Sequence, residues 1–117
     1  QCGTKWSGVG TAPVGTFKPN PWGLYDAAGN VLEFVSDCWH TDHVETPTDG
    51  TPYKTRKCQS RIMKGGSWYY KSKVARPAAR VRNDVRVAGY FISFRVLREL
   101  APPRRGAPAA GPRPVSP

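Results

Sequence analysis

The chain has 117 residues and a formal net charge of +10, which allows one small domain with a modest core. No apolar run approaches the roughly 20 residues that cross a bilayer, so no membrane partner is expected. A positive charge of this size can attract acidic partners such as nucleic acids or other polyanions. However, no segment interleaves Lys and Arg with base-stacking aromatic residues, so a solvated basic surface is favoured over nucleic-acid binding.

The N-terminal third contains turns followed by one clear strand pattern. Residues 1–23 hold the turn signals "SGVG", "TAPVG" and "KPNPWG", with a short extended piece at residues 14–17. From residue 31 an extended segment would place Val31, Glu33 and Val35 on one side and Leu32, Phe34 and Ser36 on the other, and the β-branched and aromatic content favours a strand over a helix. Residues 40–60 are predicted to form a long polar loop. A loop of that length without regular structure usually contains a functional site or is held by a cross-link.

Three further elements are expected after this loop. "RIMKGGSWYY", residues 61–70, should begin as a second strand and break at Gly65 and Gly66. "SKVARPAARVRN", residues 72–83, allows a short helical turn that Pro77 limits. "GYFISFRVLREL", residues 89–100, alternates from Tyr90 onward and predicts a last, buried strand. Short strands joined by long irregular segments predict an α+β or mostly-β domain.

The last segment, residues 101–117, reads "APPRRGAPAAGPRPVSP" and has almost no apolar side chain larger than alanine. It cannot bury enough surface to offset the entropy lost on ordering. We expect a disordered or polyproline-II tail there, with a ligand for an aromatic groove as the alternative. The predicted domain is therefore residues 1–100.

The order of the motifs is similar to that of a known family. "PNPWGLYDAAGNVLEF", then "RIMKGGSW", then an Arg-rich turn and "FRVLREL" resemble the C-terminal part of the formylglycine-generating enzyme family, the sulfatase-modifying-factor domain, over residues 2–100. The resemblance implies a C-type-lectin-like α+β fold with much irregular structure. It also implies an incomplete one, because the family domain is longer than this chain.

The stretch "DAAGNVLE" matches a calcium site of the family. The resemblance implies four ligands: the side chains of Asp26 and Glu33 and the carbonyls of Gly29 and Val31. Calcium binds six to eight oxygens and accepts carbonyls beside carboxylates, so these residue types are suitable. The alternative is that Asp26 caps the Gly-Asn turn and Glu33 pairs with an arginine.

The family's copper site, by contrast, is not matched. Its oxidases hold Cu(I) with two cysteines after the glycine pair, because soft thiolates select that ion. The matching positions here are Tyr70 and Ala75, so copper binding is not expected. No residue is assigned a catalytic role, formylglycine formation is not expected, and the chain is interpreted as a pseudoenzyme.

A ligand cleft is predicted from the residues around the lost copper site. The aromatic residues Trp68, Tyr69 and Tyr70, together with Arg76 and Arg80, are of the type that holds an anionic or peptide ligand. The alternative is that the arginines pair with carboxylates and connect the strands.

Three cysteines allow one disulfide and a leftover thiol, or three free thiols. A bridge between Cys38 and Cys58 would close the polar loop and contribute roughly 3 kcal/mol in an oxidising compartment. Cys2 would then be left over. The alternative is three reduced thiols in the cytosol, and nothing in the sequence decides the compartment.

Three functions follow from these observations. The first is a non-catalytic domain that binds a ligand or protein, with an upstream segment or second chain completing the fold. The second is the C-terminal part of an oxidoreductase of the same family, whose catalytic residues lie in a missing N-terminal portion. The third is a basic module that binds acidic polymers.

Overall fold

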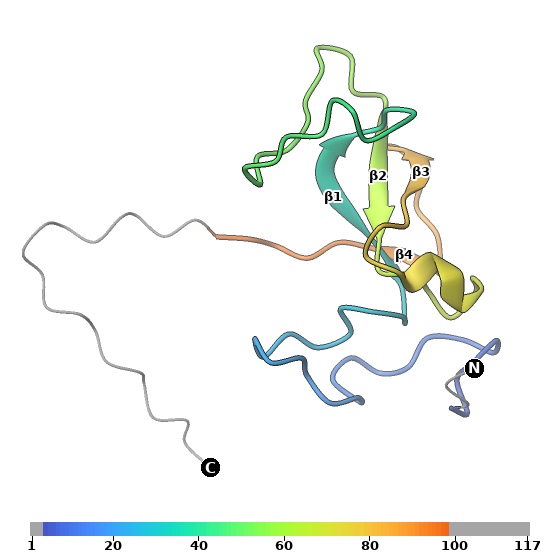
Figure 1. Cartoon of the computed structure of the whole chain (residues 1–117). Coiled ribbons are helices and arrows are strands. Elements are labelled where there is room, and N and C mark those ends of the chain that lie inside the picture. The colour runs from blue at the N-terminus through green and yellow to red at the C-terminus, as the bar shows by residue number, and fades with distance from the viewer. Residues whose placement is uncertain (1–3, 99–117) are drawn as a thin grey trace, which may run out of the picture.

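The computed structural model describes residues 4–98, which contain five short elements joined by turns and irregular segments (Figure 1). The elements are β1 (Leu32–Cys38), β2 (Ser60–Lys64), the 3-10 helix η1 (Ser72–Ala75), β3 (Val81–Asp84) and β4 (Ile92–Ser93). Across these residues no α-helix is present, so the helical part of the expected α+β class is not found. Nor does this region offer any helix long and apolar enough to cross a membrane. The expected tail, residues 101–117, lies outside the described residues.

The four strands form one small mixed sheet in the order β3-β2-β1-β4. β1 and β2 are antiparallel, as are β2 and β3, while β4 lies parallel to β1. The register between β1 and β2 shifts after Phe34, which faces Met63, so that Cys38 faces Arg61. A shift of this kind adds twist to a strand pair, and Figure 1 shows β1 as a strongly curved strand.

The core is small and lies on both sides of β2. The buried apolar residues of the described chain are Ala12, Leu32, Cys38, Ile62 and Met63. Because Ile62 and Met63 are neighbours in a strand, their side chains point to opposite faces of the sheet. Irregular segments must therefore cover both faces, since no helix does so. Figure 1 shows the N-terminal segment at one end of the sheet and the 39–59 loop at the other.

Two strand predictions are wrong at the C-terminal side. The last strand covers only Ile92–Ser93, and the residues expected to be buried after it are open: Phe94 is 71% exposed, Val96 85% and Leu97 81%. The segment expected to allow a helical turn, residues 72–83, includes residues 81–83, which instead form most of β3. Pairing with β2, with Ile62 opposite Arg82, decides its conformation instead. The helical turn itself is confirmed as η1, which ends before Pro77.

The break after β2 is confirmed at Gly65 and Gly66, which both have positive φ, +92° and +73°. The second glycine is required for space as well as for conformation. A Cβ at Gly66 would lie 3.0 Å from the backbone nitrogen, Cα and Cβ of Ala75. The chain from η1 therefore packs directly against the glycine turn.

We predict that Gly66→Ala destabilises the fold more than Gly23→Ala. Both glycines have nearly the same φ, +73° and +77°, so both variants lose about 1–3 kcal/mol from a left-handed non-glycine residue. Only the variant at Gly66 also meets Ala75, whereas a Cβ at Gly23 meets nothing within 4 Å. Urea unfolding followed by tryptophan fluorescence measures the difference. Equal midpoint shifts would show that the packing against Ala75 contributes nothing.

Candidate functional site

The site is built on two turns that are bonded to each other. The amide of Gly29 donates to the carbonyl of Gly65 at 2.7 Å, and the amide of Trp68 donates to the carbonyl of Asn30 at 2.9 Å. The side chain of Asn30 accepts from the amide of Ala12 at 3.0 Å and donates to its carbonyl at 3.1 Å. Three segments far apart in sequence therefore meet at one point. Asn30 has a φ of +57°, which Asn tolerates better than most residues.

A groove of about 730 Å³ lies beside these turns. It is lined by Trp68, Tyr69 and Tyr70, by Ala75 on the η1 side, and by Gly29 from the opposite turn. The positions that match the copper cysteines, Tyr70 and Ala75, therefore face one cavity. The described cysteines, Cys38 and Cys58, are joined to each other elsewhere. The donor set does not fit Cu(I), because no thiolate lines the groove.

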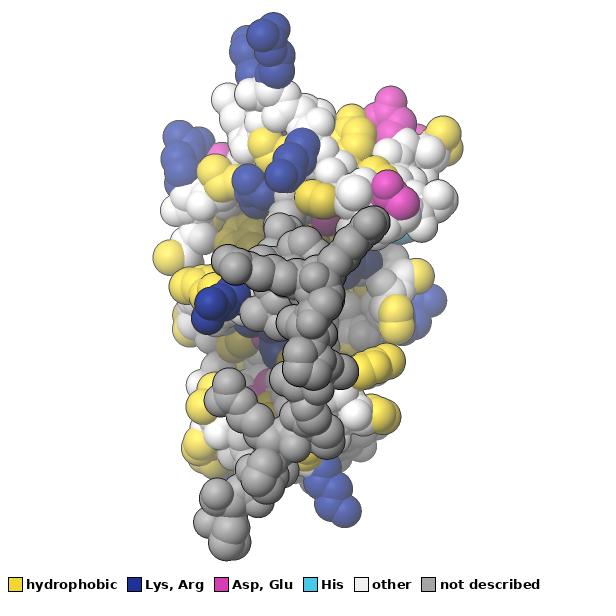
Figure 2. Space-filling view, turned by 90° about the vertical axis from the view of Figure 1, so that its left-hand side faces the viewer, with side chains coloured by type: hydrophobic (Ala, Val, Ile, Leu, Met, Phe, Trp, Pro, Cys, Tyr) yellow, Lys and Arg dark blue, Asp and Glu magenta, His cyan; other side chains and the backbone are white. Residues whose placement is uncertain are grey.

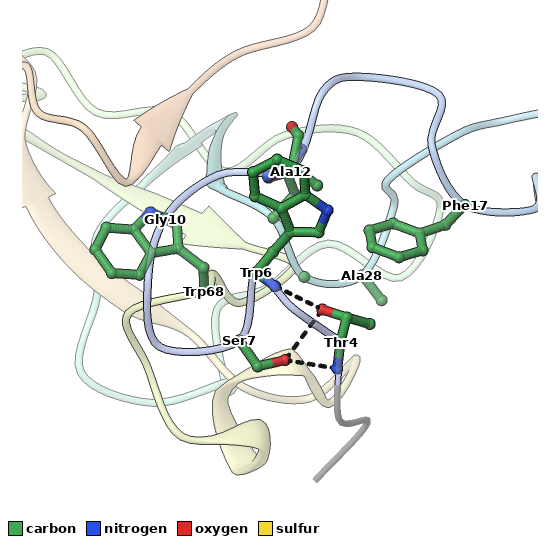
Figure 3. Close-up of a pocket in the computed structure, with 10 residues that line it drawn as sticks. Thr4, Trp6, Ser7, Gly10, Ala12, Phe17, Ala28 and Trp68 are labelled. Atoms are coloured by element: carbon green, nitrogen blue, oxygen red, sulfur yellow. Dashed lines mark hydrogen bonds between the residues drawn. The ribbon is translucent and has the colours of Figure 1, made fainter.

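A second, smaller hollow of about 250 Å³ shares Trp68 and Gly29 with the groove. Figure 3 shows Trp68 on one side, Phe17 on the other, and Trp6 between them. The N-terminal segment thus supplies the far wall. The groove and the hollow are neighbouring cavities that share the indole of Trp68.

Five aromatic rings form a continuous cluster along the groove. Trp68, Tyr69, Tyr70, Tyr90 and Phe91 contact one another with centroids 5.1–6.0 Å apart, and the rings of Tyr69 and Phe91 are stacked. The indole nitrogen of Trp68 donates to the carbonyl of Tyr90 at 3.4 Å. Tyr69 is nevertheless 58% exposed and Tyr90 65%. The cluster is therefore an ordered aromatic surface that remains open to solvent.

The two arginines that were expected in this cleft lie elsewhere. Arg80 donates to the carbonyls of His40 and Thr41 at 3.0 and 3.1 Å, and its guanidinium lies 5.1 Å from the ring centroid of Trp39. Arg76 donates to the carbonyl of Lys73 at 3.1 Å. Neither is among the residues that line the groove. Lys71 is the cation that lines it.

The expected calcium ligands lie around the first turn. Asp26 accepts from the amide of Gly15 through Oδ2 at 3.1 Å, while its Oδ1 is buried and has no hydrogen-bond partner. A buried carboxylate oxygen without a hydrogen-bond partner is uncommon in folded proteins. The carbonyl oxygens of Ala27 and Val31 lie 3.4 and 3.9 Å from where a Cβ of Gly65 would be.

Glu33 is engaged by an arginine. Both of its carboxylate oxygens accept hydrogen bonds from Arg95, which also donates to the carbonyl of Tyr25 at 3.1 Å. The hydrogen bond to Glu33 raises the pKa of Arg95 above its ordinary value. Within residues 4–98 no group of three or more Cys, His, Asp or Glu side chains is placed to hold a metal ion. Glu33 could contact a calcium ion only by sharing its carboxylate with Arg95.

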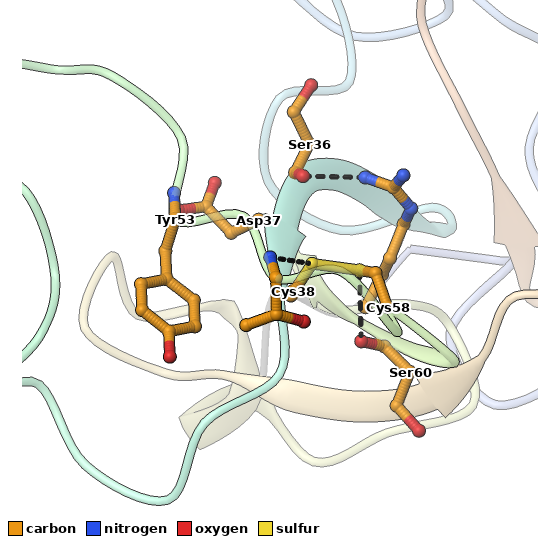
Figure 4. Close-up of a disulfide and its surroundings, with 8 residues drawn as sticks. Ser36, Asp37, Cys38, Tyr53, Cys58 and Ser60 are labelled. Atoms are coloured by element: carbon orange, nitrogen blue, oxygen red, sulfur yellow. Dashed lines mark hydrogen bonds between the residues drawn. A yellow bond between two sulfur atoms is a disulfide. The ribbon is translucent and has the colours of Figure 1, made fainter.

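The polar loop after β1 is closed by a disulfide between Cys38 and Cys58, the expected pair (Figure 4). The amide of Tyr53 donates to Oδ1 of Asp37 at 3.0 Å, and the amide of Cys38 donates to the carbonyl of Tyr53 at 2.8 Å. The hydroxyl of Tyr53 donates to Glu45 at 2.7 Å, which raises the pKa of Tyr53. The loop is thus held at both ends and through its middle.

Sequence reasoning missed the role of three residues. Asn30 is the residue that links the turns, and its signal was the Gly-Asn pair, which had been interpreted as a turn alone. Tyr90 and Phe91 belong to the aromatic cluster, but the alternating pattern placed them in a strand. Their ring contacts with Tyr69, edge to face for Tyr90 and stacked for Phe91, have no signature in the sequence because the residues lie about twenty positions apart.

Comparison with known proteins agrees with this geometry. The sulfatase-modifying factor enzyme 1-like domain matches residues 2–100. The chain belongs to this family. The resemblance seen in the motifs is thereby confirmed. The matched stretch includes both turns and all the groove residues.

The curated relatives are much longer than the chain. It is 35% identical to the formylglycine-generating enzyme of Mus musculus over 96 residues, which cover 80% of this chain and 26% of that protein. It is 43% identical to the enzyme of the same name from Thermomonospora curvata over 63 residues, 51% of this chain and 21% of the enzyme. A third relative, the chaperone protein LppX of Paenibacillus barcinonensis, is 35% identical over 88 residues, which cover 75% of this chain and 28% of that protein. The chain therefore spans about a quarter of the length of these proteins.

Two solved structures share the fold. PvdO from Pseudomonas aeruginosa superimposes with a TM-score of 0.68 at 36% identity, over 73% of this chain and 33% of that one. Treponema denticola variable protein 1 gives a TM-score of 0.64 at 32% identity. The match covers 75% of this chain and 32% of that one. The small curled sheet and the long irregular segments are thus part of a larger family domain.

Proposed function

We propose that this chain is a non-oxidase member of its family and that its groove binds an extended segment of another polypeptide. The observation that carries the proposal is that Tyr70 and Ala75 form walls of one groove. The turn pair supports a cavity at the place where the family's oxidases hold copper. Without thiolates the cavity presents mainly aromatic side chains. Such a surface is suited to binding another molecule by apolar contact.

The character of the groove favours a polypeptide ligand. Tyr and Trp rings supply large, rigid contact area at low entropic cost, and their polar groups hydrogen-bond to backbone. Lys71 and Ser72 add polar groups to the lining. One relative is named a chaperone, which supports a ligand of this class.

We predict that removing the exposed tyrosines abolishes peptide binding. A phage-displayed library of linear 12-residue peptides, selected on the full chain, should yield binders with apolar or aromatic side chains. The double variant Tyr69→Ala, Tyr70→Ala should weaken them tenfold or more, because central tyrosines carry much of the energy of an interface. Trp22→Ala is the control, since Trp22 is 83% exposed and does not line the groove.

Two results would contradict this function. One is that no peptide is selected, or that Trp22→Ala weakens the binders as much as the double variant. The other is an aldehyde, detected by mass spectrometry, in a peptide with a CxPxR core after incubation with the chain, copper and oxygen. That product would mean that the chain oxidises cysteine after all.

A calcium ion is the cofactor that we propose for the first turn. Asp26 would hold it together with the carbonyls of Gly29 and Val31, and Glu33 would share its carboxylate between the ion and Arg95. The orphaned Oδ1 of Asp26 supports this arrangement. When bound, the ion would supply charge neutralisation at a turn that positions Trp68.

Calcium is therefore predicted to stabilise the chain. At a hundred times its dissociation constant, an ion that binds only the folded state adds about 2.7 kcal/mol to the free energy of unfolding. Asp26→Asn should remove this gain, and Asp42→Asn, a change in the polar loop, should keep it. Thermal melts with calcium and with chelator measure the effect. Identical melts in both conditions would reduce Asp26 to a turn cap.

The exposed apolar residues suggest that more protein covers this domain. We infer that a further segment of the family domain, upstream in the same polypeptide or on a second chain, packs against the segment that holds Phe94, Val96 and Leu97. The completed domain would have the C-type-lectin-like arrangement. Figure 2 shows hydrophobic side chains distributed over the surface between separate Lys and Arg side chains. The short relative span of the chain, 26% of the mouse enzyme, supports the inference.

Expressed alone, the chain should therefore melt broadly and bind a hydrophobic dye, because its apolar surface lacks a cover. The double variant Val96→Ser, Leu97→Ser should bind less dye. Val44→Ser, an equally exposed position in the polar loop, should change it little. A sharp two-state melt of a monomer that binds no dye would show that the domain is complete as it stands.

A further inference from the structure

A polar pocket of about 190 Å³ lies beside the disulfide, at the opposite end of β1 from the groove. Its walls include Lys57, Thr55 and Gln59 from the closed loop and Arg82 from β3. No carboxylate lines it. Two cations therefore face one small cavity without a counter-charge. Neither the strand pairing nor the groove uses the side chains of Lys57 and Arg82 that line this pocket.

The cations are not neutralised by neighbours. Within residues 4–98 there are two ion pairs, Arg86–Asp84 and Arg95–Glu33, and neither includes Lys57 or Arg82. Asp84, at the end of β3, gives both oxygens to Arg86, which lowers the pKa of Asp84 to about 2. The nearest acid on this strand is therefore already committed to another arginine.

The backbone around the pocket is held in place, and the side chains of Lys57, Gln59 and Arg82 extend from it into solvent. The disulfide joins Cys38 to Cys58, and the amide of Thr55 donates to Sγ of Cys38 at 3.4 Å. The amide of Val85 donates to the carbonyl of Gln59 at 3.1 Å, which ties the loop to the end of β3. Because the backbone is already held, a ligand has to order only side chains when it binds.

The donors come from several directions. Nε of Arg82 donates to the hydroxyl of Ser60 at 3.3 Å, which positions the guanidinium with its terminal nitrogens uncommitted. No hydrogen bond within the described residues occupies the side chains of Thr55, Lys57 or Gln59. A planar carboxylate is satisfied by a single arginine fork, whereas this set of donors suits a group with oxygens on several sides.

We propose that this pocket binds one tetrahedral oxyanion, a sulfate or phosphate group. Its size admits a single group rather than a polymer chain. The aromatic residue in its wall, Trp39, already has Arg80 over one face of its ring, which reduces the surface on which a base could stack. The site is separate from the groove and does not depend on the proposed function.

The test is an NMR titration of the full chain at constant ionic strength, with sodium chloride replaced stepwise by sodium sulfate or sodium phosphate. Saturable shifts are expected at the amides of Lys57 and Gln59 and at Nε of Arg82. Phosphoserine and glucose 6-sulfate form two further arms. If the esters bind as tightly as the free ions, the natural ligand is a sulfate or phosphate group carried on a larger molecule. If the esters bind more weakly, the natural ligand is the free ion.

Lys57→Gln and Arg82→Gln should each weaken binding tenfold or more. Lys57→Gln removes no contact of the fold, so it remains informative if Arg82→Gln perturbs β3. The control is Lys54→Gln, in the same loop outside the pocket. Shifts that grow linearly without saturation, or an equal loss in Lys54→Gln, would overturn the proposal, because either result indicates diffuse attraction to a basic surface.

Discussion

The two hydrogen bonds between the Gly29–Asn30 turn and the Gly65–Trp68 turn are the constraint on which the structure depends. They fix the chain just before β1 and just after β2, so they set the end of the central strand pair. Asn30 then attaches the N-terminal segment through the backbone of Ala12. With five buried apolar residues in the described chain, hydrophobic burial alone is a weak organiser. The hydrogen bonds between the turns therefore do much of the work of holding the segments together.

The same constraint would let a family architecture persist without oxidase chemistry, which is what we propose for this chain. The turn pair and the contact between Gly66 and Ala75 shape the groove through backbone atoms. The chemistry of the groove is decided by side chains that point into it. On our proposal, Tyr70 and Ala75 at the positions of the two thiolates give the groove a different function, while its backbone frame is kept. The aromatic rings then set its character.

The sequence allowed part of this account to be predicted. The β-branched and aromatic residues from position 31 and the break at Gly65 and Gly66 located β1 and β2, because strand propensity and glycine conformation are local properties. The motif order identified the family, and closure of the polar loop suggested the pairing of Cys38 with Cys58. These features depend on residues near one another or on a motif already known.

What was missed depends on contacts between distant residues. β3 has no local strand pattern, and its conformation comes from pairing with β2. The last strand was overestimated, because Phe94 and Val96 alternate like buried residues but have no described partner to bury them. Arg80 was placed in the cleft by its nearness in sequence, whereas it bonds to carbonyls forty positions away. The pairing of Glu33 with Arg95 was considered only as an alternative.

Amide hydrogen exchange of the full chain tests the central claim most directly, since it reports the two turn bonds individually. If the turns organise the fold, the amides of Gly29 and Trp68 should exchange as slowly as those of β1 and β2, and all should become faster together in Gly66→Ala. The amide of Thr51, which is bonded only to Asp49 in the exposed loop, should exchange much faster. Rapid exchange at Gly29 and Trp68 beside a protected sheet would contradict the account.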